Sequence, residues 1–313
     1  MAFQRVGILS IGEMGYHWAR LLKEHGVEVM TSGRSRSEVT QKRAENAGVR
    51  SAPIARLVSE ADLIVSIVVP SAAKKVAAQV AKALSRVGRK DCLYLDANAI
   101  SPMTAGDIDR LLAPAEANFV DGCIIGSAAK LTDATVYVSG PRAEELRGLQ
   151  DSGFSVEVLG KATGQASAFK VVYAGLTKGL QGLLTELLVG ARKFDLLPEI
   201  MRRYEESFPG LVSKVGRSIA ALPVHAGRRA EEMRELRATF HHHGLKAVIA
   251  PATQKVLEQI AALECGKPSE TGGREGDLLE TLELFFLRGL LQEKDSGLEA
   301  ATRFPSLTKG HKR

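Results

Sequence analysis

The sequence predicts an α/β protein in which a doubly wound sheet is followed by an all-helical domain. Short apolar runs alternate with helical patterns in the first half, a glycine turn follows the first run, and no strand pattern occurs after Gly164. At 313 residues and 33.6 kDa the chain is long enough for two domains. Its 45% hydrophobic and 25% charged residues are typical of a globular protein.

The first half is expected to form the sheet. Strands that are apolar almost throughout are typical of a parallel sheet covered on both faces. Their alternation with helices implies right-handed βαβ units. The expected strands are Val6–Ser10, Val27–Met30, Leu63–Val69, Cys92–Leu95, Phe119–Ile124, Thr135–Ser139 and Ser155–Leu159. The expected helices between the first strands are Glu13–His25, Ser37–Ala47, Ser71–Ser85 and Pro102–Leu112.

The second half is expected to be helical. The stretch Ala166–Phe194 is apolar or small along most of its length, which favours burial between domains or between subunits, so we expect a homodimer. The stretch CGKPSETGGREG is expected to be a polar loop. The further expected helices are Pro198–Ser207, Leu211–Ala221, Ala226–His243, Ala247–Leu263 and Asp277–Glu293.

The composition excludes several classes of protein. The net charge is +6, but the basic residues are scattered and aromatic residues make up 5%, so we expect anionic small molecules rather than nucleic acid as partners. Three cysteines without metal-ligand spacing predict a reducing compartment and no metal site. No signal peptide or apolar stretch of membrane-spanning length is present, which predicts a cytoplasmic protein without membrane contact.

Glycines at the first strand-to-helix junction predict a nucleotide-binding turn. The stretch RVGILSIGEMGYHWARLL has Ser10, Gly12 and Gly15 where a dinucleotide-binding turn carries three glycines. Gly12 would let the backbone approach a pyrophosphate, and Gly15 would let the helix pack on the strand. Glu13 and Met14 would open the helix whose N–H groups receive the phosphates. A plain strand-to-helix turn is the alternative.

The next strand predicts which nicotinamide cofactor binds. An NAD site carries Asp or Glu at the end of this strand, but here the chain continues TSGRSRS. Ser32, Gly33, Arg34 and Ser35 combine a guanidinium with hydroxyl groups, which suits the 2′-phosphate of NADP(H). We therefore expect NADP(H), with an ordinary solvated basic turn as the alternative.

Four segments in order resemble the β-hydroxyacid dehydrogenase family, relatives of 6-phosphogluconate dehydrogenase. The resemblance covers nearly the whole sheet domain and the start of the helical one, and it implies a Rossmann-like N-terminal domain. The family's DxSTxxP segment is matched by DANAISP, its Asp-Ala-Pro-Val-Ser-Gly-Gly segment by DGCIIGS, and GxGxxxKxxNN by GQASAFKVVYA. The matched residues are Met14-Gly15, Gly33-Arg34-Ser35, Asp96 to Pro102, Asp121 to Ser127, Gly164 and Lys170.

The substrate-facing positions depart from the family pattern. Ile125 stands where the family has a serine that helps hold a carboxylate, and Ala174 where it has an asparagine that holds a hydroxyl or carbonyl. Neither side chain can form the lost hydrogen bond, so the resemblance implies a substrate other than a simple 3-hydroxy acid. With its Asp-x-Asn-x-x-Ser-Pro segment, Asp96 to Pro102, the chain resembles a divergent, 6-phosphogluconate dehydrogenase-like branch of the family whose substrates are mostly unassigned.

Lys170 is the predicted catalytic residue. Hydride transfer between an alcohol carbon and nicotinamide C4 requires a group that takes the hydroxyl proton in oxidation and returns it in reduction. The residues around Lys170 are small or apolar, which indicates a partly buried helix face. A lysine that extends from a buried helix to solvent is the alternative.

These observations predict an NADP(H)-dependent dehydrogenase or reductase acting on a small polar hydroxy acid or the corresponding carbonyl compound. Lys170 would be the general acid and base, while Asn98, Gly126, Ser127 and Tyr173 would hold the substrate in an interdomain cleft. Residues 1–162 would bind the cofactor, residues 163–299 would form the substrate and dimerisation domain, and residues 300–313 a disordered basic tail. The expected cofactor contacts are Gly12, Glu13, Met14, Gly15, Ser32, Gly33, Arg34, Ser35, Val69, Pro70 and Asn98.

Two rival functions stay open. An imine reductase shares this two-domain plan, although such enzymes generally replace the lysine. A non-catalytic NADP(H)-binding sensor or scaffold would explain Ile125 and Ala174, but it gives no reason to keep Lys170.

Other polar groups are weaker candidates. His241–His243 fit a helix C-terminus before Gly244 better than a metal site. Arg228, Arg229 and Glu232 either bind an anionic substrate in a partner's cleft or form ion pairs within one helix. Asp96 and Asp121 are expected to anchor loops.

Overall fold

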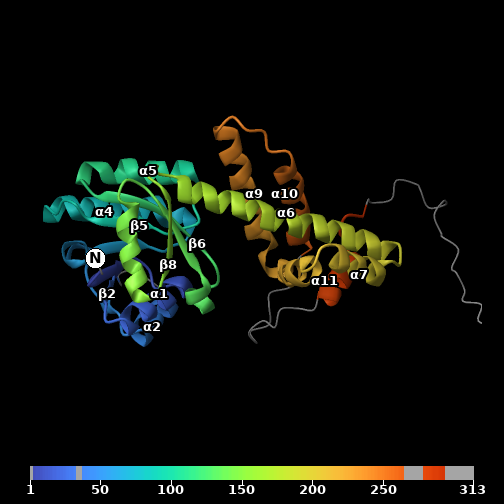
Figure 1. Cartoon of the computed structure of the whole chain (residues 1–313), viewed down its shortest axis with the longest axis horizontal. Coiled ribbons are helices and arrows are strands. Elements are labelled where there is room, and N and C mark those ends of the chain that lie inside the picture. The colour runs from blue at the N-terminus through green and yellow to red at the C-terminus, as the bar shows by residue number, and fades with distance from the viewer. Residues whose placement is uncertain (1–2, 33–36, 264–277, 293–313) are drawn as a thin grey trace, which may run out of the picture. The chain divides into compact units, whose positions relative to one another are not determined.

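The structure, a computed structural model, describes residues 3–32, 37–263 and 278–292 (Figure 1). The chain divides into two compact units, residues 1–176 with 232–250, and residues 177–231 with 251–313. The division falls inside three helices, α6 (Gln165–Lys193), α9 (Leu222–His242) and α10 (Ile249–Ala262). The first turns of α6 thus group with the sheet, and the expected boundary at residue 162 stays a prediction.

The first unit is built on a sheet whose described strands follow the order β3-β2-β1-β4-β5-β6-β7-β8. The strands from β3 to β6 are parallel, and β7 runs antiparallel to β6 and parallel to β8. The order 3-2-1-4-5-6 is that of a doubly wound, Rossmann-like sheet, so the predicted fold class is confirmed. The strands are β1 (Arg5–Ile8), β2 (Glu28–Thr31), β3 (Arg50–Ser51), β4 (Leu63–Ser66), β5 (Leu93–Asp96), β6 (Asn118–Ile125), β7 (Thr135–Ser139) and β8 (Ser155–Gly160).

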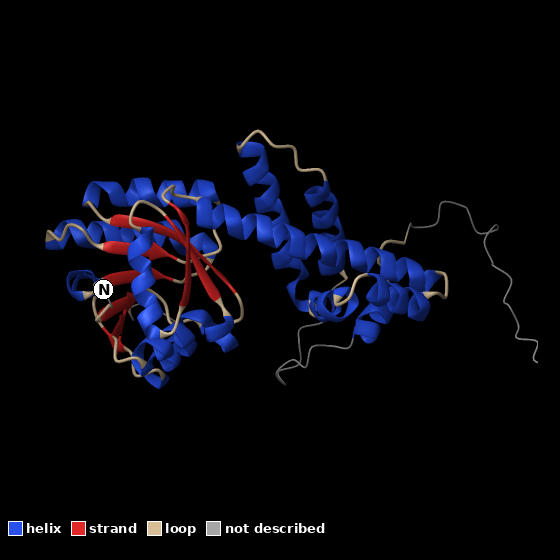
Figure 2. Cartoon of the chain, viewed as in Figure 1, coloured by secondary structure: helices blue, strands red, loops and turns tan. Residues whose placement is uncertain are grey.

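Helices cover both faces of this sheet, as Figure 2 shows. Trp18 and Leu22 belong to the core on one face, and Leu57 and Val80 to the core on the other. This double cover explains why the central strands are apolar throughout. The first face carries α1 (Glu13–Glu24), α2 (Glu38–Asn46) and the 3-10 helix η4 (Ala143–Ser152), and the second carries α3 (Ile54–Glu60), α4 (Ala73–Val87) and α5 (Pro102–Leu112).

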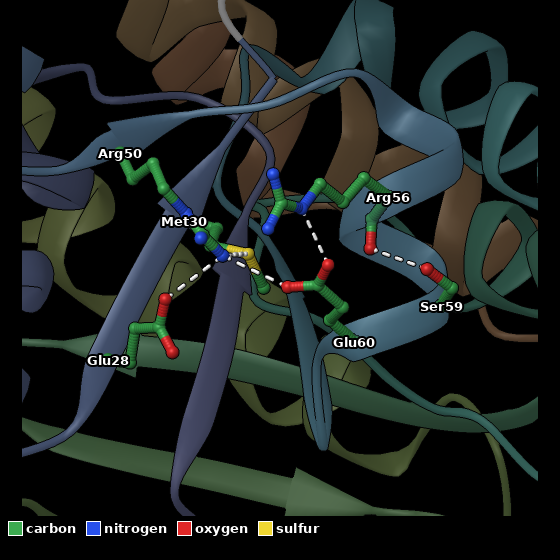
Figure 3. Close-up of polar contacts among 6 residues, drawn as sticks. All are labelled: Glu28, Met30, Arg50, Arg56, Ser59 and Glu60. Carbon is green, nitrogen blue, oxygen red and sulfur yellow. Dashed lines mark hydrogen bonds and ion pairs between the residues drawn. The ribbon is translucent and has the colours of Figure 1, made fainter.

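The sequence analysis missed β3 and α3. The strand β3 has two residues, too few for a periodic pattern, and polar contacts hold it at the sheet edge (Figure 3). The Arg50 guanidinium lies 2.9 Å from a Glu28 carboxylate oxygen and 3.0 Å from one of Glu60. Arg56 of α3 donates to Glu60 over 2.6 Å. Side chains from three separate elements therefore define this edge, which a local pattern cannot reveal.

Several predicted boundaries were wrong by part of an element. The strand expected at 63–69 ends at Ser66, because the Val68 N–H donates to the Asn98 side chain. The helix expected at 71–85 is preceded by a 3-10 turn, and the helix expected at 211–221 begins as a π-helical turn. The elements concerned are η1 (Pro70–Ala72), η5 (Leu211–Val215) and α8 (Gly216–Ala220).

The last predicted helix is also shorter than expected. α11 (Leu278–Leu287) ends where Gly289 and Leu291 take positive φ values of 74° and 61°, because a left-handed residue interrupts the helical hydrogen bonds. Asp277 and Glu293, the ends of the predicted helix, lie outside the described residues. The loop CGKPSETGGREG and the predicted tail, residues 300–313, also lie outside them.

The second unit consists of helices in its described part. Leu188, Ile219, Leu257 and Phe285 are fully buried and come from four of these helices. Arg229 donates to the Gln181 side-chain oxygen over 3.0 Å and to the Ser218 carbonyl over 2.7 Å. The remaining helices are α7 (Leu197–Ser207) and α10 (Ile249–Ala262), and the short 3-10 helices of the first unit are η2 (Ala113–Ala115) and η3 (Ala128–Asp133).

Candidate functional site

The predicted cofactor residues follow the carboxyl ends of neighbouring parallel strands. Gly12 follows β1, Ser32 follows β2, Val69 follows β4, and Asn98 follows β5. β1 pairs with β2 on one side and with β4 on the other, so the strand order reverses at β1. Ligands of open α/β sheets bind at this edge, outside the strand ends where the order reverses. The sheet thus brings these four residues to one edge.

The glycine turn has the geometry that its two remaining glycines require. A Cβ atom at Gly15 would overlap the Ser10 carbonyl oxygen, so glycine is needed for α1 to approach the turn. A Cβ at Gly12 would meet nothing within 4 Å, which means that open space adjoins the turn there. Ser10 is not among the described non-glycine residues with positive φ. Serine therefore stands at the first glycine position without backbone strain.

The start of α1 fits a phosphate group. Helix α1 begins at Glu13, directly after Gly12, and within the described part of the chain no side chain caps it. The N–H groups of a first helical turn lack partners inside the helix and carry partial positive charge. The open space at Gly12 and these N–H groups fit the pyrophosphate of a dinucleotide.

The predicted specificity turn lies largely outside the described residues. Ser32 is half-buried at the end of β2, while Gly33, Arg34 and Ser35 lie outside the described residues. On the other side of β1, Val69 is 66% exposed and Pro70 is exposed as well. An exposed valine at the ligand-binding edge offers apolar contact to a bound ring.

Asn98 connects the ends of two strands. Its side chain is buried, and its amide oxygen accepts a hydrogen bond from the Val68 N–H over 2.6 Å. Its amide nitrogen donates to the Ser66 hydroxyl over 3.0 Å. These bonds hold the loop that carries Val69 and Pro70, so Asn98 supports this loop as well as standing at the predicted site.

Asp96 supports Asn98 from the end of β5. One carboxylate oxygen accepts the Asn98 backbone N–H over 3.0 Å, and the other is buried without a hydrogen-bond partner among the described residues. Burial raises the pKa of Asp96 to about 7, although the Asn98 hydrogen bonds oppose the shift. The predicted role of Asp96 as a loop anchor matches these contacts.

Lys170 lies at the carboxyl end of β6. Its ammonium group is half-buried and donates to the Ile124 carbonyl oxygen over 2.7 Å. Because β6 runs parallel to β5, this end of β6 belongs to the same sheet edge as Asn98. Gly126 follows with a φ of 143°, and a Cβ there would overlap Ala134, so glycine is required. Gly126 and Ser127 are both exposed residues, and they follow closely after Ile124, whose carbonyl oxygen accepts the Lys170 hydrogen bond.

Buried polar side chains from β6 and β7 hold the start of α6. Asp121 accepts the Ser167 N–H over 2.9 Å and the Ser167 hydroxyl over 2.6 Å. Ser139 donates to Asp121 over 3.2 Å and accepts the Ala166 N–H over 3.0 Å. Burial raises the pKa of Asp121, against the effect of these hydrogen bonds. Since Ser167 lies one turn before Lys170, this cluster sets the position of the lysine.

Sequence reasoning named Asp121 only as an anchor and did not select Ser139 or Ser167. The available signal was a carboxylate inside an apolar strand, FVDGCII, because an aspartate is rarely buried without partners. The identity of those partners depends on the pairing of β6 with β7. The residues around Asp121 in the sequence do not predict this pairing.

Tyr173 and the weaker candidates occupy other surfaces. Tyr173 follows Lys170 by three residues on α6 and is 46% exposed. Helix α9 ends at His242, and Gly244 has a φ of 74°, so the histidine run forms a helix C-terminus as predicted. In the part of the chain that the structure describes, no group of three His, Cys, Asp or Glu side chains could hold a metal ion. None of the described helices is long and apolar enough to span a membrane.

Comparisons with known proteins show which family the chain belongs to. The model of the NAD binding domain of 6-phosphogluconate dehydrogenase matches residues 5–151, and that of a domain of unknown function (DUF1932) matches residues 191–260. An uncharacterized 28.5 kDa protein in the 7S RNA 5′ region of Methanothermus fervidus is 30% identical over 258 residues, which cover 82% of this chain and 98% of that protein. The chain belongs to the 6-phosphogluconate dehydrogenase-like family. The predicted resemblance is confirmed.

Solved structures agree with this membership. A conserved protein of unknown function, described as structurally similar to 3-hydroxyacid dehydrogenases, is 28% identical with a TM-score of 0.71, over 82% of this chain and 97% of its own. The 3-hydroxyisobutyrate dehydrogenase of Mycobacterium tuberculosis, solved with L-serine, is 16% identical with a TM-score of 0.71, over 90% and 99%. The second likeness shows the fold alone. Residues 5–151, which match the NAD binding domain of 6-phosphogluconate dehydrogenase, supply the cofactor domain of this fold.

Proposed function

We propose that this chain is an NADP(H)-dependent oxidoreductase that transfers hydride between the nicotinamide and a small polar hydroxy acid or the corresponding carbonyl compound. The observation that carries the proposal is the position of Lys170. Its ammonium group is held at the Ile124 carbonyl, at the same sheet edge as the open glycine turn. A proton-transfer group thus lies at the edge where a nicotinamide cofactor of this fold binds.

The cofactor, Lys170 and the Gly126–Ser127 segment have separate roles in the proposed reaction. The bound cofactor supplies or accepts hydride at nicotinamide C4. Lys170 takes the hydroxyl proton in oxidation and returns it in reduction, since its Nζ can exchange the Ile124 carbonyl for a substrate oxygen. The exposed Gly126–Ser127 backbone is suited to hold an anionic group of the substrate, with Tyr173 on the adjacent turn of the helix.

NADP(H) is the proposed cofactor rather than NAD(H). Residues from Glu28 to Ser32 place no carboxylate at the carboxyl end of β2, where an NAD site needs an acceptor for the ribose hydroxyls. The chain then supplies Arg34 between Gly33 and Ser35. A guanidinium attracts a 2′-phosphate that a carboxylate would repel.

A homodimer is the proposed assembly, and the cytoplasm the proposed compartment. On α6, the large apolar side chains of Val172, Leu176, Leu183 and Leu187 are between 43% and 65% exposed. An apolar surface of this kind is typical of a subunit interface. Light scattering of the purified protein measures the mass directly, and a monomer at micromolar concentration would contradict the proposal. The free thiols of Cys92 and Cys123 are buried, which is compatible with a reducing compartment.

The deciding experiment separates cofactor binding from chemistry. NADPH and NADH are titrated side by side by nicotinamide fluorescence, and hydroxy acids, their carbonyl counterparts and cyclic imines are then screened for turnover. Lys170→Met should lower turnover by at least about a hundredfold, the usual contribution of a general acid or base, and leave the NADPH dissociation constant within about twofold. Lys161→Met, which removes an exposed lysine shortly before α6, is the control and should change neither quantity.

Each other outcome selects a different function. Turnover that survives in Lys170→Met removes Lys170 from the mechanism. Turnover of imines without hydroxy acids identifies an imine reductase. Cofactor binding without any turnover across the screen favours the sensor or scaffold, and no binding of either nucleotide contradicts the proposed function as a whole.

A further inference from the structure

A second feature of the first unit is a hollow that runs along α4 beside the start of α3. It has a volume of about 590 Å³ and extends from Ser32, at the end of β2. This volume lies within the range of about 300 to 1,000 Å³ that is typical of small-molecule sites. Pro53, Ile54, Val76 and Ala83 give the hollow an apolar floor.

The polar lining of the hollow is cationic. Lys75, Lys82 and Arg86 line it together with Gln79, and no aspartate or glutamate does. Within the described residues none of these three cations forms an ion pair, although the neighbouring Lys74 pairs with Asp107. Uncompensated positive charge along one wall attracts an anion, and the apolar floor suits the face of an aromatic ring.

Lys75 is the cation at the Ser32 end of this wall. It lies in the first turn of α4, which begins at Ala73 after the loop and the 3-10 turn that follow β4, and the carboxyl ends of β4 and β2 belong to the same sheet edge. Lys82 lies seven residues further along the helix, or about 10.5 Å at 1.5 Å per residue. A phosphate group at Ser32 is therefore closer to Lys75 than to Lys82.

A smaller hollow on the other side of Ser32 provides a contrast. It measures about 190 Å³, and its lining includes Ile11, Thr31 and Glu45 but no lysine or arginine. A carboxylate without a neighbouring cation repels a phosphate. Of the two hollows that share Ser32, the α4 hollow is thus the one that suits a phosphate.

We propose that the Ser32 end of the α4 hollow binds the adenosine 2′-phosphate end of the cofactor and that Lys75 determines the preference for NADPH over NADH. The apolar floor at Ile54 and Val76 holds the adenine ring, while the Lys75 ammonium contacts the 2′-phosphate. This inference rests on the proposed function, because it assigns a further specificity residue to the same cofactor. It adds a contact from a different element to the one expected of Arg34.

The test compares two lysines on one face of one helix. Dissociation constants for NADPH, NADH and adenosine 2′,5′-bisphosphate are measured for the full chain and for Lys75→Gln, Lys75→Arg and Lys82→Gln. Lys75→Gln should weaken NADPH and the bisphosphate by about tenfold and NADH by less than about twofold, because only the first two carry the phosphate. Lys75→Arg should keep the preference. Lys82→Gln, about one Debye length away, should change NADPH binding by less than about threefold.

The outcomes separate this inference from the proposed function. Equal losses for NADPH and NADH in Lys75→Gln, equal effects of Lys75→Gln and Lys82→Gln on NADPH, or an unchanged preference would each overturn the role of Lys75. Failure of the unmodified chain to bind adenosine 2′,5′-bisphosphate while it binds NADH would overturn the subsite itself. Binding of the bisphosphate without binding of either nicotinamide cofactor would support the subsite and contradict the oxidoreductase proposal.

Discussion

The N-termini of α1 and α6 lie at the same edge of the sheet, but they are completed in different ways. Helix α1 has no side-chain cap among the described residues, and open space adjoins Gly12 before it. At α6, the Ala166 and Ser167 N–H groups donate to Ser139 and Asp121, which are buried. Each first helical turn has N–H groups that need acceptors. Here no side chain caps the first turn of α1, whereas buried side chains accept the N–H groups at the start of α6.

This difference explains what each terminus does. An open terminus beside a glycine can receive a phosphate, because nothing within the described chain competes for its N–H groups. A terminus already occupied by a buried carboxylate cannot bind an anion, but it holds its helix firmly against the sheet. Lys170, one turn after Ser167, is positioned by that second arrangement. The following predictions test whether the two termini differ in this way.

The largest expected effect comes from breaking the occupied terminus. Asp121→Ala removes the acceptor for the Ser167 N–H and hydroxyl and the Ser139 hydroxyl, so it should cost about 3 to 5 kcal/mol in the free energy of unfolding. The milder Asp121→Asn keeps one oxygen and should lower turnover at least about tenfold, with NADPH affinity within about twofold. Urea unfolding and steady-state kinetics measure the two effects.

A matched control tests whether burial is the reason. Asp62 also accepts two backbone N–H groups, those of Gln4 and Arg5, but in an exposed position. Asp62→Ala should cost only about 1 kcal/mol and leave turnover unchanged. If Asp121→Asn turned over as fast as the unmodified chain, Asp121 would not position Lys170.

The open terminus offers a paired test with a smaller effect on stability. Gly15→Ala places a Cβ against the Ser10 carbonyl, so it should destabilise the fold by about 2 kcal/mol and weaken NADPH binding. Gly12→Ala meets no protein atom within 4 Å and should change stability by less than about 1 kcal/mol, yet it should still weaken NADPH binding about tenfold because the methyl group fills the space for the pyrophosphate. Thermal unfolding and fluorescence titration give both values. Unchanged NADPH binding in Gly12→Ala would show that this space is not the phosphate site.

The smallest effect concerns pH and the carboxylate behind Asn98. Burial raises the pKa of Asp96 to about 7 in the folded protein, above its ordinary value of 3.8. The folded state therefore binds this proton more tightly than the unfolded state, and stability is lost as pH rises from about 4 to about 7. Asp96→Asn cannot titrate, so its stability relative to the unmodified chain should rise by about 2 kcal/mol between pH 5 and pH 7. Urea midpoints at the two pH values test the sign, and a constant difference would contradict the raised pKa.

Much of the fold could be predicted from the sequence, because the patterns that indicate its strands and turns lie within short stretches of the chain. Apolar runs at β1, β4 and β5 and a glycine turn before α1 each follow from residues close together in the chain. The sequence did not predict the edge strand β3, because contacts of Arg50 with Glu28 and Glu60, which lie in separate elements, hold it in place. Of the candidate site, the glycines and Lys170 could be selected from spacing and resemblance, and their roles stay predictions.

By itself, the sequence determined that an α/β sheet precedes a helical region, that a glycine turn follows the first strand, and which family the chain resembles. Only the tertiary structure decided which groups meet. Asp121, Ser139 and Ser167 lie far apart in sequence and form one cluster because β6 and β7 pair and α6 packs on them. Lys75 and Ser32 line one hollow because β4 and β2 end at the same edge. Periodicity reports the burial of single elements, whereas a site depends on strand order, and strand order is settled by long-range packing.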